Sequence, residues 1–491
     1  MLVRPDNLAV ALVDSLQNRQ GDIVLSVDCE DISGSEFLSR SAGRQKQLAN
    51  AGLKLGDRIF IQGGRGSLFW SDFLAVWGMG GVAIPLSPAI SLRDFSIQRT
   101  KAEAAGFIGR QGEIDSAGLA VIEDSPTASS GELSVLPMTL DDEAAILFTS
   151  GSSGEPKGVR LSHRSVLGNA IASTKAIGFR ATDSLFIAIG FHFTSAICHF
   201  LAAILSRGKL TATERPMLQG EMYAALTESG CNSFGGAPVQ LRWIARCARE
   251  DPIKLGWIMS SGDRLPRELI DDLKAVLPET KIHTFYGLTE LGGRFCALPA
   301  EKIATHAGSV GRPIEGMSVR IAGDQGESLP PDTLGEITAS GEYLFTDYLN
   351  DPEKTSLVFD GNELRTGDVG YLDKEGFLYV EGRNDDVFKV SGRKVSALVV
   401  QQALMDCGIF EDVAVVQFED PELGSIARAL YSLKKDGTFR RGKILGILRK
   451  NLPKHFLPAL FTEVPSVPRT GSGKLDRRAL KKLMYQTDKI E

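Results

Sequence analysis

Over roughly the first 380 residues, short apolar runs alternate with amphipathic stretches. The apolar runs include Arg58–Gln62, Val82–Pro85, Ala144–Phe148 and Asp183–Ala188. Between such runs, stretches that include Ser71–Gly78 and Ser165–Ile177 repeat their apolar residues at helical spacing. Strands that alternate with helices predict βαβ units and parallel sheets.

The pattern changes twice toward the C-terminus. Glu315–Ile337 contains short strand-like runs separated by turns, which predicts an antiparallel appendage. Beyond Arg383 the alternation of helices and strands resumes. There we expect helices at Ser396–Met405 and Lys443–Asn451 and a strand at Asp412–Phe418.

The polar turn cluster Arg383–Asp386 lies between two strand-like runs and predicts a domain boundary. We therefore expect an α/β fold with two domains. Residues 1–384 would form a large domain of βαβ-type sheets with helices and a small antiparallel subdomain. Residues 385–491 would form a small α+β domain.

Composition is typical of a globular protein. Of the 491 residues, 43% are hydrophobic and 24% are charged, which argues against a disordered chain. No apolar run reaches the ~20 residues of a membrane span, and the N-terminus lacks the apolar core of a signal peptide. The cysteines form no CxxC pair, which favours buried thiols in a reducing compartment: Cys29, Cys198, Cys231, Cys247, Cys296 and Cys407. We expect a cytoplasmic protein.

Charge is distributed unevenly along the chain. From Asp386 onward there are 19 Lys and Arg residues against 12 Asp and Glu residues, a net charge of +7, whereas the preceding part carries −13. A basic C-terminal part suggests an anionic partner. A solvated basic helix at the tail explains the same charge, so charge alone does not separate these two interpretations.

The segment Thr149–Gly158, TSGSSGEPKG, directly follows the apolar run Ala144–Phe148. Glycines let backbone N–H groups approach an anion, hydroxyl groups donate further hydrogen bonds, and Lys157 adds positive charge. The segment therefore predicts a polyphosphate-binding loop, although its spacing is not that of a P-loop. A flexible linker is the alternative, but linkers rarely follow a buried strand directly.

Three further segments carry chemistry that is weak in isolation. In Phe285–Glu290 an aromatic ring can stack on a purine, a hydroxyl can reach a phosphate and a carboxylate can bind Mg²⁺. In Arg365–Asp368 the final carboxylate can accept both hydroxyl groups of a ribose, although an ordinary turn has the same sequence. In Pro468–Arg478 a Gly-rich loop carries Lys474, which can deliver an ammonium group into a site.

Taken in order, these segments resemble the ANL superfamily of adenylate-forming enzymes. The superfamily contains acyl- and aryl-CoA synthetases, peptide-synthetase adenylation domains and luciferases. The resemblance runs from about Leu53 to Leu480 and includes the hydroxyl-rich loop, YGLTE, TGD, the GRNDD hinge and the terminal SGK. It implies ATP-dependent activation of a carboxylic acid to an acyl-adenylate, with Mg²⁺ and a C-terminal domain that rotates between two half-reactions.

The resemblance also implies roles for individual residues. The β- and γ-phosphates of ATP would be held by Thr149, Ser150, Gly151, Ser152, Ser153, Gly154 and Lys157. The adenine would lie between the Tyr286–Gly287 segment and the turn Ser261, Gly262 and Asp263. The ribose would be bound by Asp368 and Arg383, with Asp385 as the hinge residue. The catalytic residues would be Lys474 for adenylation, Lys389 for the second conformation, Thr289 at the α-phosphate and Glu290 at Mg²⁺.

The acid pocket is less well determined. Where peptide-synthetase domains carry an Asp for the α-amino group, this chain has His192, so an α-amino acid is disfavoured and an acyl or aryl acid is expected. The pocket would be lined by His192, Phe193, Ser195, Gly236, Ala237, Gly262 and Leu291. Arg294 can bind a second acidic group of the substrate, or it can form an ordinary ion pair.

The thiol acceptor is left open. CoA is favoured, with contacts from Gly392, Arg393 and Lys394, while an acidic acyl carrier protein suits the same basic surface. A nucleotide-binding regulator without activity ranks last. Two positions depart from the family: Ser396 where a Pro is usual, and Asp347 where a Gly usually precedes the Tyr.

Overall fold

The structure is a computed structural model of the whole chain. It describes residues 6–110, 118–122, 131–150, 155–215, 217–383, 387–390, 393–420, 424–469, 475–476, 479–480 and 483. For a few of these positions only the backbone is described: 150, 387, 389, 393, 394, 424 and 451.

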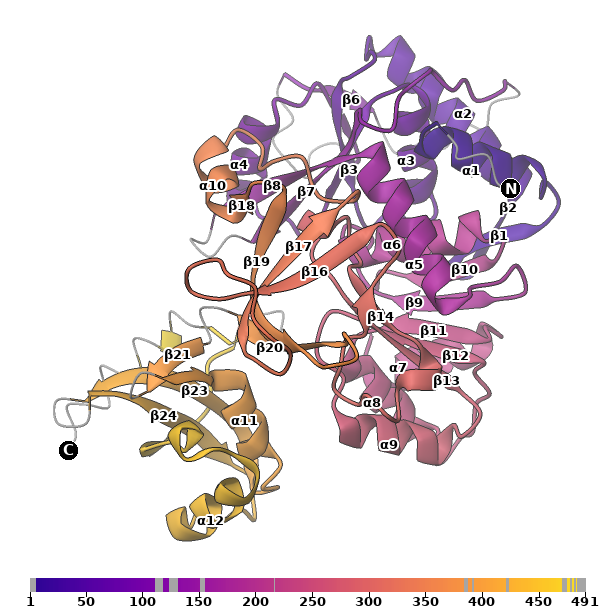
Figure 1. The fold of residues 1–491 in the computed structure, drawn as a ribbon. Helices are drawn as coiled ribbons and strands as arrows, with labels where there is room; N and C mark the ends of the chain where they lie inside the picture. Colours follow the sequence, from indigo (N-terminus) through magenta and orange to yellow (C-terminus); the bar gives the residue numbers. More distant parts are fainter. Residues whose placement is uncertain are drawn as a thin grey trace. The chain divides into compact units, whose positions relative to one another are not determined.

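The chain divides into two compact units (Figure 1). The first consists of Met1–Arg320, Thr338–Thr366 and Asp373–Tyr379. The second consists of Ile321–Ile337, Gly367–Leu372 and Val380–Glu491.

The larger sheet of the first unit has nine strands. In spatial order they are β15 (Arg312–Pro313), β14 (Cys296–Leu298), β13 (Lys281–Tyr286), β12 (Trp257–Ser260), β11 (Ser233–Gly236), β9 (Ser184–Ala188), β10 (Lys209–Thr213), β1 (Ile23–Val27) and β2 (Glu30–Ser33). The strands from β13 through β1 run parallel, and antiparallel strands complete both edges. The carboxyl ends of β9, β11, β12 and β13 therefore meet at one edge, where ligands of parallel sheets usually bind.

A second sheet of this unit has six strands. Their order is β6 (Ala120–Ile122), β5 (Gly106–Ile108), β3 (Arg58–Gln62), β4 (Val82–Leu86), β7 (Glu143–Ser150) and β8 (Pro156–Ser162). All pairs are parallel except the β7–β8 hairpin, which carries the predicted polyphosphate loop at its tip.

The helices of the first unit cover these sheets. They are α1 (Leu8–Gln17), α2 (Gly34–Asn50), α3 (Leu68–Gly78), α4 (Leu92–Ala102), α5 (Asn169–Ile177), α6 (Thr194–Leu205), α7 (Gln219–Glu228), α8 (Pro238–Cys247), α9 (Arg267–Val276) and α10 (Pro352–Val358). A π-helical turn, η1 (Arg164–Gly168), precedes α5. Helices α3 and α6 are both apolar and buried, and they meet through the stacked rings of Trp70 and Phe200, 4.4 Å apart.

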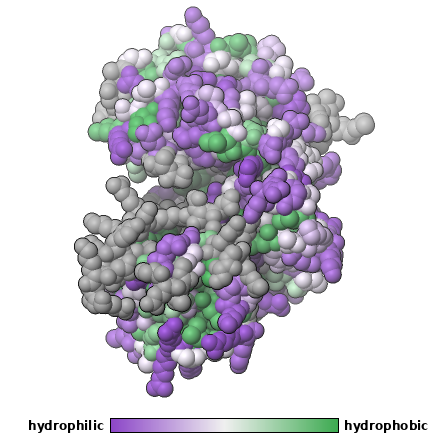
Figure 2. All heavy atoms as spheres, turned by 60° about the vertical axis from the view of Figure 1, so that its left-hand side comes forward, coloured by the Kyte–Doolittle hydropathy of each residue, from purple (hydrophilic) through white to green (hydrophobic). Residues whose placement is uncertain are grey.

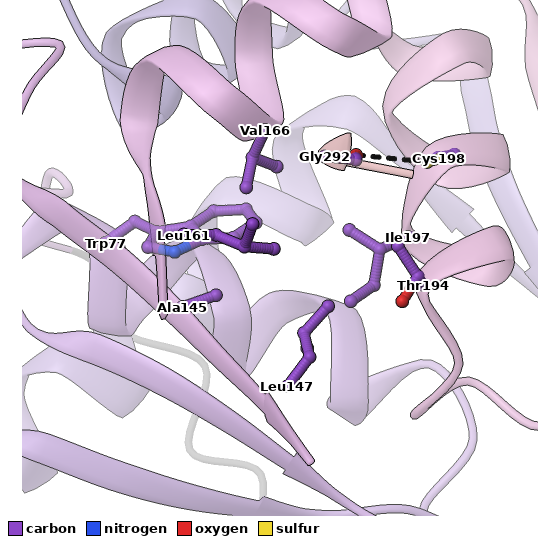
Figure 3. Close-up of a pocket in the computed structure, with 9 residues that line it drawn as sticks. All are labelled: Trp77, Ala145, Leu147, Leu161, Val166, Thr194, Ile197, Cys198 and Gly292. Atoms are coloured by element: carbon purple, nitrogen blue, oxygen red, sulfur yellow. Dashed lines mark hydrogen bonds between the residues drawn. The ribbon is translucent and has the colours of Figure 1, made fainter. Parts of the chain in front are cut away.

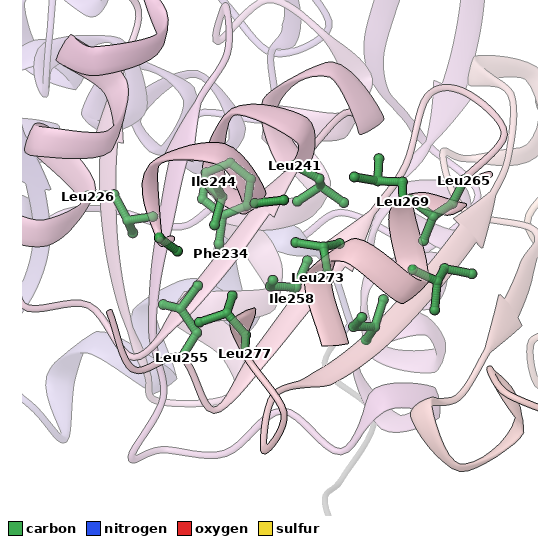
Figure 4. Close-up of a cluster of buried hydrophobic side chains, with 14 of the residues drawn as sticks. Leu226, Phe234, Leu241, Ile244, Leu255, Ile258, Leu265, Leu269, Leu273 and Leu277 are labelled. Carbon is green, nitrogen blue, oxygen red and sulfur yellow. The ribbon is translucent and has the colours of Figure 1, made fainter. Parts of the chain in front are cut away.

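Helices α7, α8 and α9 pack on one face of the nine-stranded sheet (Figure 4). Leu226, Leu241 and Ile244 from the helices meet Phe234 and Ile258 from the strands, and all five are fully buried. This cluster fixes β11 and β12 under the helices, so the loops that follow these strands start from rigid positions. Among the residues drawn in colour in Figure 2, hydrophilic ones predominate on the face shown, and hydrophobic ones form small patches.

A small sheet of five strands follows. Its order is β16 (Met317–Ala322), β17 (Gly335–Gly341), β19 (Glu363–Leu372) and β18 (Phe359–Asp360), with β20 (Leu378–Arg383) also beside β19. The β18–β19 pair is antiparallel.

The C-terminal part of the second unit is α+β. It contains the hairpin β21 (Val387–Val390) and β22 (Arg393–Ser396), helices α11 (Ala397–Met405) and α12 (Arg441–Asn451), and a sheet of β23 (Phe410–Asp420), β24 (Gly424–Leu433) and β25 (Leu460–Glu463). Its own core includes Val400, Leu404, Val413, Ala429 and Leu448. Ser396, the departure from the family's usual Pro, caps α11 because its hydroxyl accepts a hydrogen bond from the Val399 N–H.

The predicted fold class is confirmed, and the predicted elements lie close to the observed ones. The run Arg58–Gln62 is β3, and the predicted helix Ser396–Met405 is α11 with its cap. One prediction was too short: α3 begins at Leu68 rather than Ser71, because Phe69–Gly78 are buried on all sides and no polar face marks its start. No helix in the described part of the chain is long and apolar enough to cross a membrane.

Candidate active site

The loop predicted to bind polyphosphate connects β7 to β8. Thr149 at the end of β7 pairs with Lys157 at the start of β8. The Thr149 hydroxyl is buried and has no hydrogen-bond partner among the described residues. Because a buried hydroxyl without a partner is costly, this oxygen is available for a ligand.

Three side chains meet beside this hairpin. Lys157 Nζ lies 2.8 Å from Glu290 Oε1 and 2.9 Å from the Tyr348 hydroxyl, which in turn donates to Glu290 Oε1 at 2.8 Å. The ammonium group also lies 4.4 Å from the centroid of the Tyr348 ring. Lys157, Glu290 and Tyr348 are called the Lys–Glu–Tyr triangle below.

The triangle holds Glu290 as a carboxylate. Burial raises the pKa of Glu290, but the Lys157 ammonium and the hydrogen bonds from Lys157 and Tyr348 together lower it below its ordinary value. Mg²⁺ in nucleotide sites is usually held by one or two carboxylates together with phosphate oxygens. One ionised carboxylate next to an ammonium group and a free hydroxyl therefore fits a magnesium–polyphosphate ligand.

The YGLTE segment follows β13 and is fixed by its glycine. A Cβ atom on Gly287 would lie 1.9 Å from the Gly293 carbonyl oxygen, so no other residue fits. Thr289–Leu291 then form a single 3₁₀ turn, which directs Glu290 into the triangle. The Thr289 hydroxyl lies 2.8 Å from that of Thr194, the first residue of α6.

The turn after β12 lies next to the end of β11. The Ser261 N–H donates to the Gly236 carbonyl oxygen at 3.1 Å, and Gly262 has a φ of +89°, which favours glycine. The structure thus brings the predicted adenine-side turn next to Gly236 and Ala237, which were predicted for the acid pocket.

His192 lies in the loop between β9 and α6. Its Nδ1 atom is buried and has no hydrogen-bond partner among the described residues. Burial lowers the pKa of His192 to about 4, so the ring is neutral near pH 7.

A cavity of about 400 Å³ opens beside this loop. Two of the predicted acid-pocket residues, Phe193 and Ser195, line it together with Glu214, Gln240 and Trp243. The carboxylate of Glu214 is held by the N–H groups of Phe191 and Gly64, at 2.9 and 2.7 Å.

A second, much smaller cavity lies between α6 and the β7–β8 hairpin (Figure 3). Its volume is about 10 Å³, and Trp77, Leu147, Leu161, Ile197 and Cys198 are among its lining residues. It holds at most one water molecule, so it cannot receive an acid.

The predicted ribose residues belong to the second unit. Asp368 on β19 is buried, and its carboxylate forms an ion pair of 2.8 Å with Arg383 on β20. Several predicted residues lie outside the described residues: Gly151, Ser152, Ser153, Gly154, Asp385, Gly392 and Lys474. For four more only the backbone is described: Ser150, Lys389, Arg393 and Lys394.

The sequence analysis assigned no role to Tyr348. Its contact with Lys157 joins residues 191 positions apart, so no local pattern marks it. The preceding Asp347, unexplained from the sequence, forms an ion pair with Arg160 at 2.8 Å. That pair anchors the segment that carries Tyr348 to β8.

Comparison with known proteins adds the family. The model of the AMP-binding enzyme family matches residues 12–349, and that of the AMP-binding enzyme C-terminal domain matches residues 399–474. The 2-succinylbenzoate–CoA ligase of Bacillus cereus is 25% identical over 474 residues, which cover 94% of this chain and 95% of that enzyme.

Solved structures share the fold. The o-succinylbenzoate CoA synthetase of Bacillus subtilis with its acyl-adenylate intermediate has a TM-score of 0.86 at 22% identity, covering 98% of this chain and 99% of that one. Its complex with ATP and a magnesium ion has a TM-score of 0.85 at 22% identity, covering 96% and 99%. Because the first family model alone matches more than half of the sequence, the chain belongs to the AMP-binding enzymes of the ANL superfamily.

Proposed function

We propose that this protein activates a carboxylic acid with ATP and transfers the acyl group to CoA. The observation that carries the proposal is the Lys–Glu–Tyr triangle at the base of the polyphosphate loop. It is supported by the CoA ligases among the relatives and by the ATP and magnesium ion bound in a structure of the same fold.

The first half-reaction forms the acyl-adenylate. An oxygen of the acid attacks the α-phosphorus of ATP, and pyrophosphate leaves. Bound Mg²⁺ supplies positive charge that offsets the repulsion between the two anions. Lys157 and the Thr149 hydroxyl bind phosphate oxygens, while Thr289 contacts the α-phosphate and is oriented by Thr194.

The remaining site residues are assigned as the family resemblance implies. Tyr286, Gly287 and the turn Ser261–Asp263 bind adenine, and Asp368 with Arg383 binds the ribose. Lys474 promotes adenylation, Lys389 serves the second half-reaction, and Asp385 is the hinge. We place the two functional domains at residues 1–384 and 385–491, which agrees with the gap between the matches at 12–349 and 399–474.

The acid is an acyl or aryl acid rather than an α-amino acid. His192 is neutral, and the one carboxylate that lines the large cavity, Glu214, already accepts two backbone N–H groups. Burial also raises the pKa of Glu214, so this engaged carboxylate is a weak partner for an ammonium group on the substrate.

In the second half-reaction a thiol attacks the acyl carbonyl and AMP leaves. We propose CoA as the thiol, bound by basic residues of the C-terminal part that include Arg393 and Lys394. A carrier-protein phosphopantetheine arm is the alternative acceptor, and we expect a cytoplasmic location from the free cysteines.

The test is pyrophosphate release from Mg·ATP with a panel of fatty, aryl, dicarboxylic and amino acids. Each active acid is then assayed for AMP formation with CoA or with a holo-carrier protein. Activity with CoA supports the proposal. Activity with the carrier protein but not with CoA would show that the carrier protein is the acceptor. ATP binding without pyrophosphate release for any acid would favour a regulator.

A further inference from the structure

Arg294 is a buried cation that has no anionic partner among the described residues. It lies between the 3₁₀ turn η2 (Thr289–Leu291) and β14, and only 4% of the residue is exposed. Its guanidinium donates to His199 Nδ1 at 2.9 Å and to the Ser173 hydroxyl at 3.5 Å, and it lies 4.6 Å from the centroid of the Phe285 ring. Within the described part of the chain, no carboxylate forms an ion pair with it.

This arrangement is costly for a folded protein. A guanidinium has five N–H groups, and the described residues accept from two of them. Burial lowers the pKa of Arg294, because the environment disfavours its charge. Buried charges are normally paired, so an unpaired one usually has a task besides stability.

His199 presents a second unused donor next to Arg294. Because arginine only donates hydrogen bonds, the His199 Nδ1 atom must accept, and the neutral ring carries its proton on Nε2. Burial and the adjacent Arg294 lower the pKa of His199 well below its ordinary value, which keeps the ring neutral. Its Nε2–H group is fully buried and has no partner among the described residues.

Both residues pack against segments that carry predicted site residues. A Cβ atom on Gly235, which precedes Gly236 in β11, would lie 2.7 Å from the His199 ring, so the ring packs against that strand. His199 is one helical turn beyond Ser195, which lines the large cavity. On the other side, the Arg294 Cα atom lies 2.8 Å from a Cβ built on Gly287.

We infer that Arg294, together with His199, recognises a second carboxylate group of the acid substrate. This inference rests on the proposed function and narrows its substrate class to dicarboxylic acids. One carboxylate reacts with ATP near Thr289, and the other accepts hydrogen bonds from the guanidinium and the Nε2–H group. The second carboxylate supplies the counter-charge that the protein itself does not provide.

The competing explanation is structural. Arg294 joins α5 and α6 through Ser173 and His199, and its backbone N–H donates to the Asn169 side chain at 3.1 Å. If this bridging is the whole role, replacing Arg294 lowers stability and leaves acid preference unaltered. If Arg294 binds substrate, a neutral side chain of similar length removes an unpaired charge, so stability holds or increases while preference is lost.

The experiment compares matched acids on the wild-type chain and on Arg294→Met. Each pair differs in one carboxylate: adipate with hexanoate, and 2-succinylbenzoate with 4-oxo-4-phenylbutanoate. For at least one pair we expect kcat/KM for pyrophosphate release to favour the dicarboxylate by roughly 30- to 100-fold. In Arg294→Met we expect that ratio to fall within about threefold of unity, and in Arg294→Lys to be intermediate.

Two controls keep the result decisive. Arg246→Met removes an exposed arginine of α8 and should leave the ratio unaltered. Thermal unfolding with each acid, without ATP, measures acid binding independently of adenylation. Dicarboxylate stabilisation that is lost in Arg294→Met, without any pyrophosphate release, would support the inference and overturn the proposed function.

Other outcomes overturn the inference. If the wild-type protein activates the monocarboxylate of every pair as well as the dicarboxylate, the inference is overturned without any variant. A ratio that survives Arg294→Met, or a lower melting temperature with unaltered preference, would assign Arg294 the structural role alone.

Discussion

The Tyr348 hydroxyl hydrogen-bonds to two charged groups, and Tyr348→Phe removes both hydrogen bonds. The hydroxyl donates to Glu290 at 2.8 Å and accepts from Lys157 at 2.9 Å. The ring stays, so the ammonium group keeps its position over it, and the direct Lys157–Glu290 contact of 2.8 Å also remains. Hydrogen bonds to charged groups contribute about 1.5–3 kcal/mol, so a loss of roughly 2 kcal/mol, or about 30-fold in kcat/KM for ATP, is expected.

The same substitution shifts the pH dependence. The Tyr348 hydrogen bond is one of the causes that lower the pKa of Glu290, so its removal raises that pKa. The ionised form of Glu290, which supports activity, predominates above this pKa and is lost as the pH falls through it. The acidic limb of the pH profile of pyrophosphate release should therefore move to higher pH in Tyr348→Phe.

The matched control is Tyr223→Phe. Tyr223 on α7 is also buried, and its hydroxyl donates to the Asp251 carbonyl oxygen, but it contacts none of the triangle residues. Tyr223→Phe should lower the free energy of unfolding by about 1 kcal/mol and leave the pH profile of pyrophosphate release unaltered. An unaltered kcat/KM for ATP and an unaltered acidic limb in Tyr348→Phe would refute the reasoning.

Three further predictions concern stability. Gly287→Ala places a Cβ atom 1.9 Å from the Gly293 carbonyl oxygen, and should lower the free energy of unfolding by roughly 2–4 kcal/mol in urea titration. Asp347→Asn weakens the half-exposed ion pair with Arg160 and should cost at most about 1 kcal/mol by the same measurement. Stability should fall as pH decreases from 6.5 to about 4. Burial lowers the pKa of three histidines to about 4, whereas the unfolded chain protonates them near 6.5, so protonation in this range favours the unfolded state. Replacing any of them by Gln should reduce this slope in pH-dependent unfolding: His163, His192 and His283.

The parallel strands were predictable because their signal is local. The run Arg58–Gln62 is apolar on both faces, as a strand inside a parallel sheet must be, and it is β3 in the structure. The start of α3 was missed because Phe69 and Trp70 are buried like the rest of the helix, so no polar face marks where it begins.

The site residues also differ in whether a local sequence pattern marks them. The loop after β7 and the YGLTE segment were recognisable, because their residue types and order are contiguous in the sequence. Tyr348 and the unpaired state of Arg294 were not, since both depend on residues brought together from distant parts of the chain. The sequence shows that a cation is present at position 294, but only the packing of α5 and α6 around it shows that no carboxylate of the described residues pairs with it.

The most direct test of the central claim is acid-dependent pyrophosphate release from Mg·ATP, measured for the wild-type chain and for Glu290→Gln. Glu290→Gln keeps the shape of the side chain but removes the charge that faces Lys157. We predict release that requires both ATP and a carboxylic acid, and a decrease of about 100-fold or more in the variant. Release that is independent of any acid, or unaltered in Glu290→Gln, would contradict the account.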